Sequence, residues 1–285
     1  MTAVPALVLT RTVADLRAQV ARLRNAGKRI GFVPTMGALH DGHLALVAEA
    51  RRLSDAVVAS IFVNPTQFAA HEDLGTYPRQ EARDAELLAG AGCSILFAPD
   101  AAEMYPDGFA TSVQVGGPSA GLETDFRPHF FGGVAVVVAK LLNQVQADVA
   151  VFGEKDYQQL MVVRRMARDL DIPTGIVGAP TVRDDHGLAL SSRNAYLSAD
   201  ERAVARRLNA ILRDAADQTR AGAPVAVAEA AAAEALLRAG FAKVDYVAVR
   251  HAESLAPFSG VVDAPARILA AAWLGKTRLI DNMAV

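Results

Sequence analysis

The chain has 285 residues, of which 52% are hydrophobic and 21% are charged, and its formal net charge at pH 7 is -2. This composition is typical of a folded globular protein and excludes a largely disordered one. A net charge near zero supplies no general positive field for a phosphate backbone, so nucleic acid is not expected as the main partner.

Three features predict the cellular compartment. The longest near-apolar run, 130–139, ends at Lys140 and is too short to cross a bilayer. The first residues lack the basic start, apolar core and cleavage site of a secretion signal. The single cysteine, Cys93, can form no internal disulfide and precedes an apolar run, which favours a buried structural thiol over a nucleophile. We therefore expect a cytoplasmic protein with no membrane span.

The first 180 residues alternate between short apolar runs rich in β-branched residues and longer segments of helical period. This pattern predicts an α/β fold, a Rossmann-like doubly wound parallel sheet covered by helices. The expected strands are 29–33, 56–63, 94–97, 148–152 and 174–177, and the expected helices lie near 43–54, 79–91, 133–146 and 157–170.

After Pro180 the pattern changes. Helices and strands no longer alternate strictly, which favours a smaller α+β C-terminal domain. A prior of roughly 150 residues per domain also suggests two domains. We expect a Rossmann-like domain of residues 1–181 and a smaller α+β C-terminal domain of residues 182–285. The expected helices of the second domain are 199–219 and 224–239, and its expected strands are 244–249, 268–273 and 277–280.

Ligands of open parallel sheets bind beyond the carboxyl ends of the strands, and the first strand is followed by the segment 36–43. Its glycines let the backbone approach a ligand, and the helix that begins there attracts phosphate to its N-terminus. His40 and His43 could donate hydrogen bonds to phosphate during phosphoryl transfer. A capping turn with incidental histidines and a zinc site without an evident third ligand are the alternatives.

Three later strand ends carry further polar groups. Amides such as Asn64 and Gln67 can recognise carboxylate and hydroxyl groups, Lys155 can balance phosphate charge, and Arg193 with its neighbouring serines can bind phosphate oxygens. Structural alternatives are an Asn-Pro turn, a surface ion pair and helix capping. The capping alternative applies to Ser191 or Ser192, although Ser198 suits the next helix better.

Two nucleotide-binding motifs are excluded. Gly275-Lys276-Thr277 matches only the tail of a phosphate-binding loop, because position 270 is alanine and a strand-like run follows. The dinucleotide fingerprint G-x-G-x-x-G is missing as well, so a nicotinamide-dependent dehydrogenase has no support.

Five segments occur in a fixed order, namely PTMGALHDGH, FVNPTQF, YPR, FGEKDYQQ and LALSSRN. Together they resemble the pantothenate synthetase family, strongly over residues 29–197 and more loosely to the closing TRLIDN. This family belongs to the HxGH nucleotidyltransferases, relatives of class I aminoacyl-tRNA synthetases. The resemblance implies a ligase in which the carboxylate of pantoate attacks the α-phosphorus of ATP and releases pyrophosphate. The amine of β-alanine then attacks the pantoyl adenylate, giving pantothenate and AMP.

The resemblance also implies roles for individual residues. His43 would be the principal catalytic histidine, with the other catalytic groups being His40, Lys155, Ser191, Ser192 and Arg193. Gln67 would hold pantoate and contact the approaching β-alanine, Gln159 would hold pantoate, and Asn64 would also bind substrate. Mg²⁺ would accompany the triphosphate without a metal site on the protein itself, and the chain would form a homodimer. The implied ATP-binding residues are Met36, Gly37, Ala38, Leu39, His40, Asp41, Gly42, His43, Gly153, Glu154, Lys155, Asp156, Val182, Leu190, Ser191, Ser192 and Arg193.

The chain departs from the family pattern at two places. The family segment R-P-G-H-F-x-G-V reads RPHFFGGV at 127–134, which shifts the histidine by one position, so His129 is assigned no role. Leu190 replaces the usual methionine before Ser-Ser-Arg, and its similar volume should preserve packing against adenine.

Two other functions fit parts of the pattern. One is a nucleotidyltransferase that joins AMP or CMP to a phosphorylated acceptor. The other is a protein that senses ATP without turnover, because a nucleotide site does not by itself establish catalysis.

Overall fold

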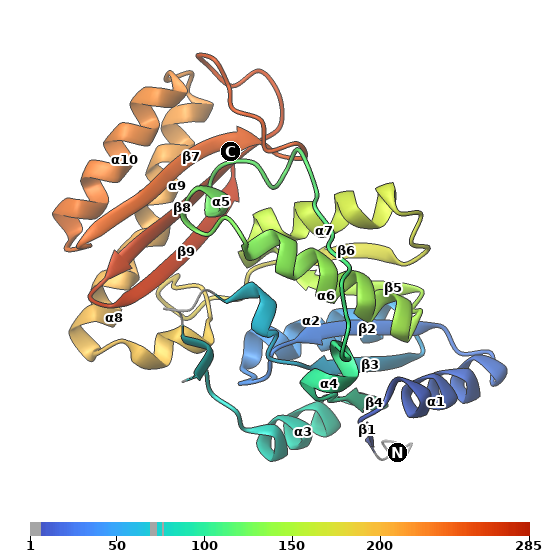
Figure 1. Ribbon diagram of the computed structural model, residues 1–285. Helices are drawn as coiled ribbons and strands as arrows, with labels where there is room; N and C mark the ends of the chain where they lie inside the picture. The colour runs from blue at the N-terminus through green and yellow to red at the C-terminus, as the bar shows by residue number, and fades with distance from the viewer. Residues whose placement is uncertain (1–6, 69–72, 76) are drawn as a thin grey trace. The chain divides into compact units, whose positions relative to one another are not determined.

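The computed structural model describes residues 7–68, 73–75 and 77–285 (Figure 1). These residues form two compact units. The first contains the described residues up to Val115 together with Arg127–Glu154 and Val162–Pro180, and the second contains Gly116–Phe126, Lys155–Met161 and Thr181–Val285. The division into domains at residue 181 stays a prediction.

The first unit is built on a six-stranded sheet in which every neighbouring pair is parallel. Its order is β1-β4-β3-β2-β5-β6. The five strands predicted from the sequence are confirmed, and β1 is an additional short edge strand. The strands are β1 (Val8–Thr10), β2 (Ile30–Thr35), β3 (Ala56–Ile61), β4 (Ile95–Phe97), β5 (Val149–Gly153) and β6 (Gly175–Ala179).

Helices pack on both faces of this sheet, as the doubly wound prediction requires. Val33, Val57 and Ala59 share one buried cluster with Val47 of α2, while the alternation of side chains along a strand turns Phe32 toward the opposite face. On that face α6 contacts β2 and α1 (Figure 1). The helical segments of the first unit are α1 (Val13–Asn25), α2 (Asp41–Leu53), η1 (Pro65–Gln67), η2 (Asp73–Gly75), α3 (Glu81–Gly90), α4 (Ala101–Met104) and α6 (Phe130–Val145), and η3 (Glu154–Asp156) and α7 (Tyr157–Asp169) have residues in both units.

The strand order creates a reversal between β2 and β5. From β2 the chain proceeds to β3 and β4 on one side, and it later returns to β5 and β6 on the other side. The carboxyl ends at such a switch point bound the crevice where open α/β sheets bind ligands. The segment 36–43 follows β2 directly, so the fold places it at this preferred position.

The second unit contains a three-stranded antiparallel sheet in the order β7-β8-β9, which confirms the predicted α+β class. Gly275 and Lys276 form the two-residue turn between β8 and β9, where Leu274 pairs with Thr277, so this segment is not a phosphate-binding loop. The predicted helix 199–219 is two helices that meet at Arg206. The elements are α5 (Glu123–Phe126), η4 (Ser192–Tyr196), α8 (Ala199–Ala205), α9 (Arg207–Arg220), α10 (Val225–Ala239), β7 (Lys243–His251), β8 (Ala266–Leu274) and β9 (Thr277–Ala284).

Two further expectations concern the burial of Cys93 and the absence of a membrane span. Cys93 is fully buried, and burial raises the pKa of its thiol to about 12, so it behaves as the expected structural thiol. Within the described residues, the helices are all too short or too polar to span a membrane.

A buried ion cluster fastens α5 to the sheet of the second unit. Arg278 on β9 donates from Nη1 to both oxygens of Glu123, at 2.9 and 2.8 Å, and from Nε to Asp245 at 2.7 Å. The Tyr246 hydroxyl donates to Glu123 at 2.8 Å. Burial raises the pKa of Tyr246, and the Glu123 charge raises it further. Arg278 is the cation that both buried carboxylates share, and the exposed Lys243 also lies 2.8 Å from Asp245. Loss of Arg278 would therefore leave the charges of this cluster poorly balanced.

We expect Arg278→Ala to lower the free energy of unfolding by about 3–5 kcal/mol, the usual effect of removing one partner from a buried ion pair. Urea denaturation measures this loss. The matched control is Arg238→Ala, which removes an exposed pair with Glu234 on α10 and should change stability by ~0.5 kcal/mol or less. Equal losses in the two variants would contradict a structural role for the buried cluster.

Candidate functional site

The loop after β2 is held by a buried carboxylate from α3. The two oxygens of Asp84 accept the backbone N–H groups of Ala38 and Leu39, both at 2.9 Å, and Asp84 itself is only 1% exposed. Gly37 has φ +83° and Ala38 has φ +51°, so this loop turns through the left-handed region, which glycine tolerates best. A side chain at Gly37 would also meet Asp84 and Ile61. The carboxylate therefore fixes a strained turn directly before the histidines.

The two histidines form a reciprocal cap at the start of α2. Nδ1 of His40 accepts the N–H of Gly42 at 3.1 Å, and Nδ1 of His43 accepts the N–H of His40 at 3.4 Å. Their ring centroids are 4.2 Å apart. Since a backbone N–H can only donate, Nδ1 must present its lone pair in both rings, and the neutral imidazoles carry their proton on Nε2.

The cap allows the histidines both to stabilise the start of α2 and to donate hydrogen bonds to a ligand. His40 is the N-cap residue, so the capping alternative describes its local role correctly. The same geometry makes Nε2 of each ring a hydrogen-bond donor at a helix N-terminus, where the helix dipole favours an anion. The described part of the chain contains no group of three or more His, Cys, Asp or Glu side chains that could hold a metal ion.

The amides after β3 lie in a network at the same end of the sheet. Asn64 caps η1 by accepting the N–H of Thr66, and it donates to Oε1 of Gln67 at 3.1 Å. Gln67 in turn donates from Nε2 to Sδ of Met36 at 3.1 Å. The structure thus brings two of the predicted substrate amides, Asn64 and Gln67, next to the loop that follows β2.

Lys155 and Asp156 belong to the second unit. The Lys155 backbone carbonyl accepts a hydrogen bond from Asn282 at 2.8 Å, which ties this turn to β9. Its ammonium group lies 3.7 Å from the Asp156 carboxylate, and side-chain exposure is 21% for Lys155 against 48% for Asp156. This long, partly exposed pair is weak, so the lysine charge remains available to an incoming anion.

The Ser-Ser-Arg segment also lies in the second unit. Leu190 donates its N–H to the carbonyl of Val182 at 2.9 Å, which places these two predicted residues side by side. Ser191 caps η4 by accepting the N–H of Arg193 at 3.3 Å. A hydroxyl that accepts can still donate, so capping and phosphate binding are compatible. Ser198 caps α8, as expected.

Gln158 and Gln159 are neighbours in α7 but differ in their surroundings. Gln158 is buried and bonds to Pro118, Gly121 and Glu123, so it anchors the segment 116–126. Gln159, the predicted substrate residue, is partly exposed.

Arg183, beside the predicted Val182, also has a structural role. It forms a bidentate pair with buried Asp281 at 2.7 and 2.8 Å. Its guanidinium is therefore engaged within the protein.

Sequence reasoning missed Asp84 and Tyr105. Asp84 acts on a loop 45 and 46 positions away, and Tyr105 donates its hydroxyl to Asn64 across 41 positions at 2.8 Å. Neither residue stands at a strand end or in a dense motif. Only the YPR segment just before α3 hinted that this helix belongs to the site.

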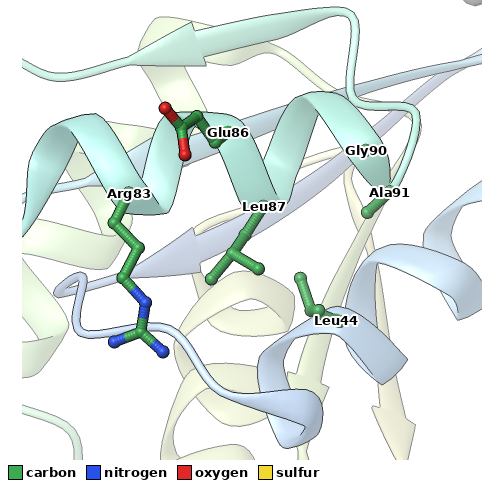
Figure 2. A pocket seen from close by; sticks show the side chains of 6 residues that line it. All are labelled: Leu44, Arg83, Glu86, Leu87, Gly90 and Ala91. Carbon is green, nitrogen blue, oxygen red and sulfur yellow. The ribbon is translucent and has the colours of Figure 1, made fainter.

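A separate pocket of about 620 Å³ lies between α2 and α3 (Figure 2). None of the residues that line it is a predicted site residue, so it is not the candidate site. They are Leu44, Arg83, Glu86, Leu87, Gly90 and Ala91.

Known proteins resemble the chain over nearly its whole length. A family model described as pantoate-beta-alanine ligase matches residues 8–284. The chain is 60% identical to the pantothenate synthetase of Caulobacter vibrioides over 280 residues, 98% of each chain. It is also 60% identical to the pantothenate synthetase of Mesorhizobium japonicum over 277 residues, 97% of each chain.

Solved structures agree with this similarity. The pantothenate synthetase of Thermus thermophilus is 52% identical, with a TM-score of 0.89, and the match covers 97% of this chain and 98% of that one. The pantoate-beta-alanine ligase of Francisella tularensis, complexed with "Beta-gamma ATP and Beta-alanine", is 34% identical, with a TM-score of 0.80 and 98% coverage of both chains.

Asp84→Asn tests the positioning of the loop. The amide has one acceptor oxygen instead of two, so one backbone N–H loses its partner and the histidines shift. We expect pyrophosphate release from ATP, the first step that the family resemblance implies, to slow by up to about 100-fold. A stopped-flow pyrophosphate assay measures it. Glu86→Gln on the exposed side of the same helix is the control, and a folded Asp84→Asn variant with the control's rate would disprove the role.

Proposed function

The chain belongs to the pantoate–β-alanine ligase family, and we propose that its histidine cap binds ATP for the reaction of that family. The reaction condenses pantoate with β-alanine to pantothenate through a pantoyl adenylate and converts ATP to AMP and pyrophosphate. The observation that carries the assignment of the site is the pair of Nε2 donors at the N-terminus of α2, next to the sheet's switch point.

In the first step a pantoate carboxylate oxygen attacks the α-phosphorus of ATP, and the bond to pyrophosphate breaks. Negative charge builds up on the phosphate oxygens, so catalysis rests on donors that are already in place. We assign this role chiefly to His43, with His40 beside it. In the second unit, Lys155, Ser191, Ser192 and Arg193 are proposed to donate to phosphate oxygens.

The remaining nucleotide contacts are assigned by residue type. The backbone of 36–42 and of Gly153 approaches the nucleotide closely, while Val182 and Leu190 offer apolar surface to adenine. Asp41, Glu154 and Asp156 are proposed to contact the nucleotide or its hydrated metal ion.

In the second step the amine of β-alanine attacks the carbonyl carbon of the adenylate. The bond between that carbon and the bridging oxygen breaks, AMP leaves with the oxygen, and the amine loses a proton. No covalent bond to the protein forms in this sequence. We propose that Asn64, Gln67 and Gln159 hold the pantoyl group, because amides bind carboxylate and hydroxyl groups directionally.

We propose that Mg²⁺ arrives with the triphosphate. Mg²⁺ is commonly held by one or two carboxylates together with substrate phosphates and water, and the described residues contain no cluster of three ligating side chains. The ion would neutralise phosphate charge, and the residues named above would orient the nucleotide.

We further propose that the protein acts in the cytoplasm as a homodimer, as the sequence resemblance implied. Sedimentation should then give a species of twice the mass of one chain. The alternative of a nucleotidyltransferase with another acceptor is not favoured, because the family model and the relatives are named for pantothenate synthesis.

Omission of substrates tests the function. Pyrophosphate release should require pantoate, and AMP release at full rate should require β-alanine as well. His43→Ala should reduce the rate of pyrophosphate release about 10²- to 10³-fold, since it removes one preorganised donor. His129→Ala, an exposed histidine without an assigned role, is the matched control. Pantoate-independent pyrophosphate release, or a near-normal rate in His43→Ala, would refute the assignment.

A further inference from the structure

The orientation of the Asn64 side chain is determined by backbone groups on its two sides. On one side the N–H of Thr66 lies 3.3 Å away, and on the other the carbonyl of Gly133 lies 3.2 Å away. An N–H can only donate and a carbonyl can only accept. Oδ1 of Asn64 must therefore face Thr66 and its NH₂ group must face Gly133.

This orientation sets that of Gln67. The Asn64 NH₂ group also donates to Gln67, so the Gln67 atom that faces it has to be the acceptor, Oε1, at 3.1 Å. The NH₂ group of Gln67 then points to the other side, where it donates to the Met36 sulfur. A thioether sulfur is a weak acceptor, so Gln67 loses little free energy when it exchanges this hydrogen bond for one to a substrate oxygen.

Close approach of α6 makes the Gly133 carbonyl available. A Cβ atom at Gly133 would lie only 2.4 Å from the carbonyl oxygen of Thr66, so a larger residue would push α6 away from η1. Glycine at this position therefore supplies one of the two backbone groups that orient Asn64.

Building on the proposed function, we propose that Tyr105 is a positioning residue for pantoate. Its hydroxyl donates to Oδ1 of Asn64 at 2.8 Å, which is shorter than the bonds to the same oxygen from the N–H and the hydroxyl of Thr66, at 3.3 and 3.0 Å. This bond adds to the backbone contacts that orient Asn64 and so helps to keep the Gln67 NH₂ group directed toward the substrate. The site then presents a donor to pantoate and selects a substrate that offers an acceptor oxygen at this point.

The surroundings of Tyr105 suit a permanent donor. Burial raises the pKa of its hydroxyl, so it stays protonated at neutral pH. The ring of Phe109 packs edge-on against that of Tyr105 with centroids 5.2 Å apart, and the ring of Phe62 lies 6.1 Å away. These contacts leave the ring little freedom to swing the hydroxyl off Asn64.

Tyr105→Phe removes only the hydroxyl. One neutral hydrogen bond corresponds to about a 5- to 10-fold effect, so we expect the KM for pantoate to rise by that factor while the KM for ATP stays within twofold. The control is Tyr157→Phe, which removes a tyrosine hydrogen bond to the carbonyl of Ala252 and should leave the KM for pantoate unchanged. An equal rise in the KM for ATP would overturn the proposal.

A double-mutant cycle separates positioning from general stability. In a Gln67→Ala background, Tyr105→Phe should raise the KM for pantoate no further, because its effect passes through Gln67. Full additivity would overturn the proposal.

Side-chain amide NMR gives a readout that does not depend on activity. In the full chain, Tyr105→Phe should shift or broaden the ¹⁵NH₂ signals of Asn64 and Gln67, and unchanged signals would overturn the proposal. If the wild-type protein showed no pantoate-dependent pyrophosphate release, the proposed function would fail while these spectra still tested the positioning.

Discussion

The site of the first unit depends on the two backbone hydrogen bonds that Asp84 accepts from Ala38 and Leu39. They hold a loop that passes through left-handed backbone conformations, and this loop determines where α2 begins. Once the start of α2 is fixed, His40 and His43 can cap it with their Nδ1 atoms, which leaves Nε2 as the donor of each ring. A buried carboxylate thus sets the direction of two histidine donors by acting on the backbone that precedes them.

The same principle applies to the amides after β3. Backbone groups with a fixed hydrogen-bonding sense orient Asn64, and Asn64 orients Gln67. At both places, backbone groups of the scaffold orient a side chain that is proposed to bind a ligand. Such preorganisation is effective in catalysis, because donors already in place need no rearrangement as charge develops.

Local patterns predicted most of the scaffold, because buried parallel strands are apolar runs and their carboxyl ends carry the polar motifs. The three-residue strand β1 is too short to give a pattern, and α1 lies outside the predicted helices. The break between α8 and α9 falls at Arg206, which has helical dihedral angles. Because no Gly or Pro stands near this position, the local sequence gives no sign that the helix is interrupted. The roles of Asp84 and Tyr105 could not be predicted from local patterns either, because they arise from contacts between segments that are distant in the sequence.

In the reaction of this family the carboxylate of pantoate is activated as an acyl adenylate. Pantoate labelled with ¹⁸O at both carboxylate oxygens tests this step, with mass spectrometry of both products after one turnover. Activation as an adenylate should place one ¹⁸O atom in the phosphate of AMP and the other in the amide carbonyl of pantothenate. AMP without label, or label in inorganic phosphate, would contradict it.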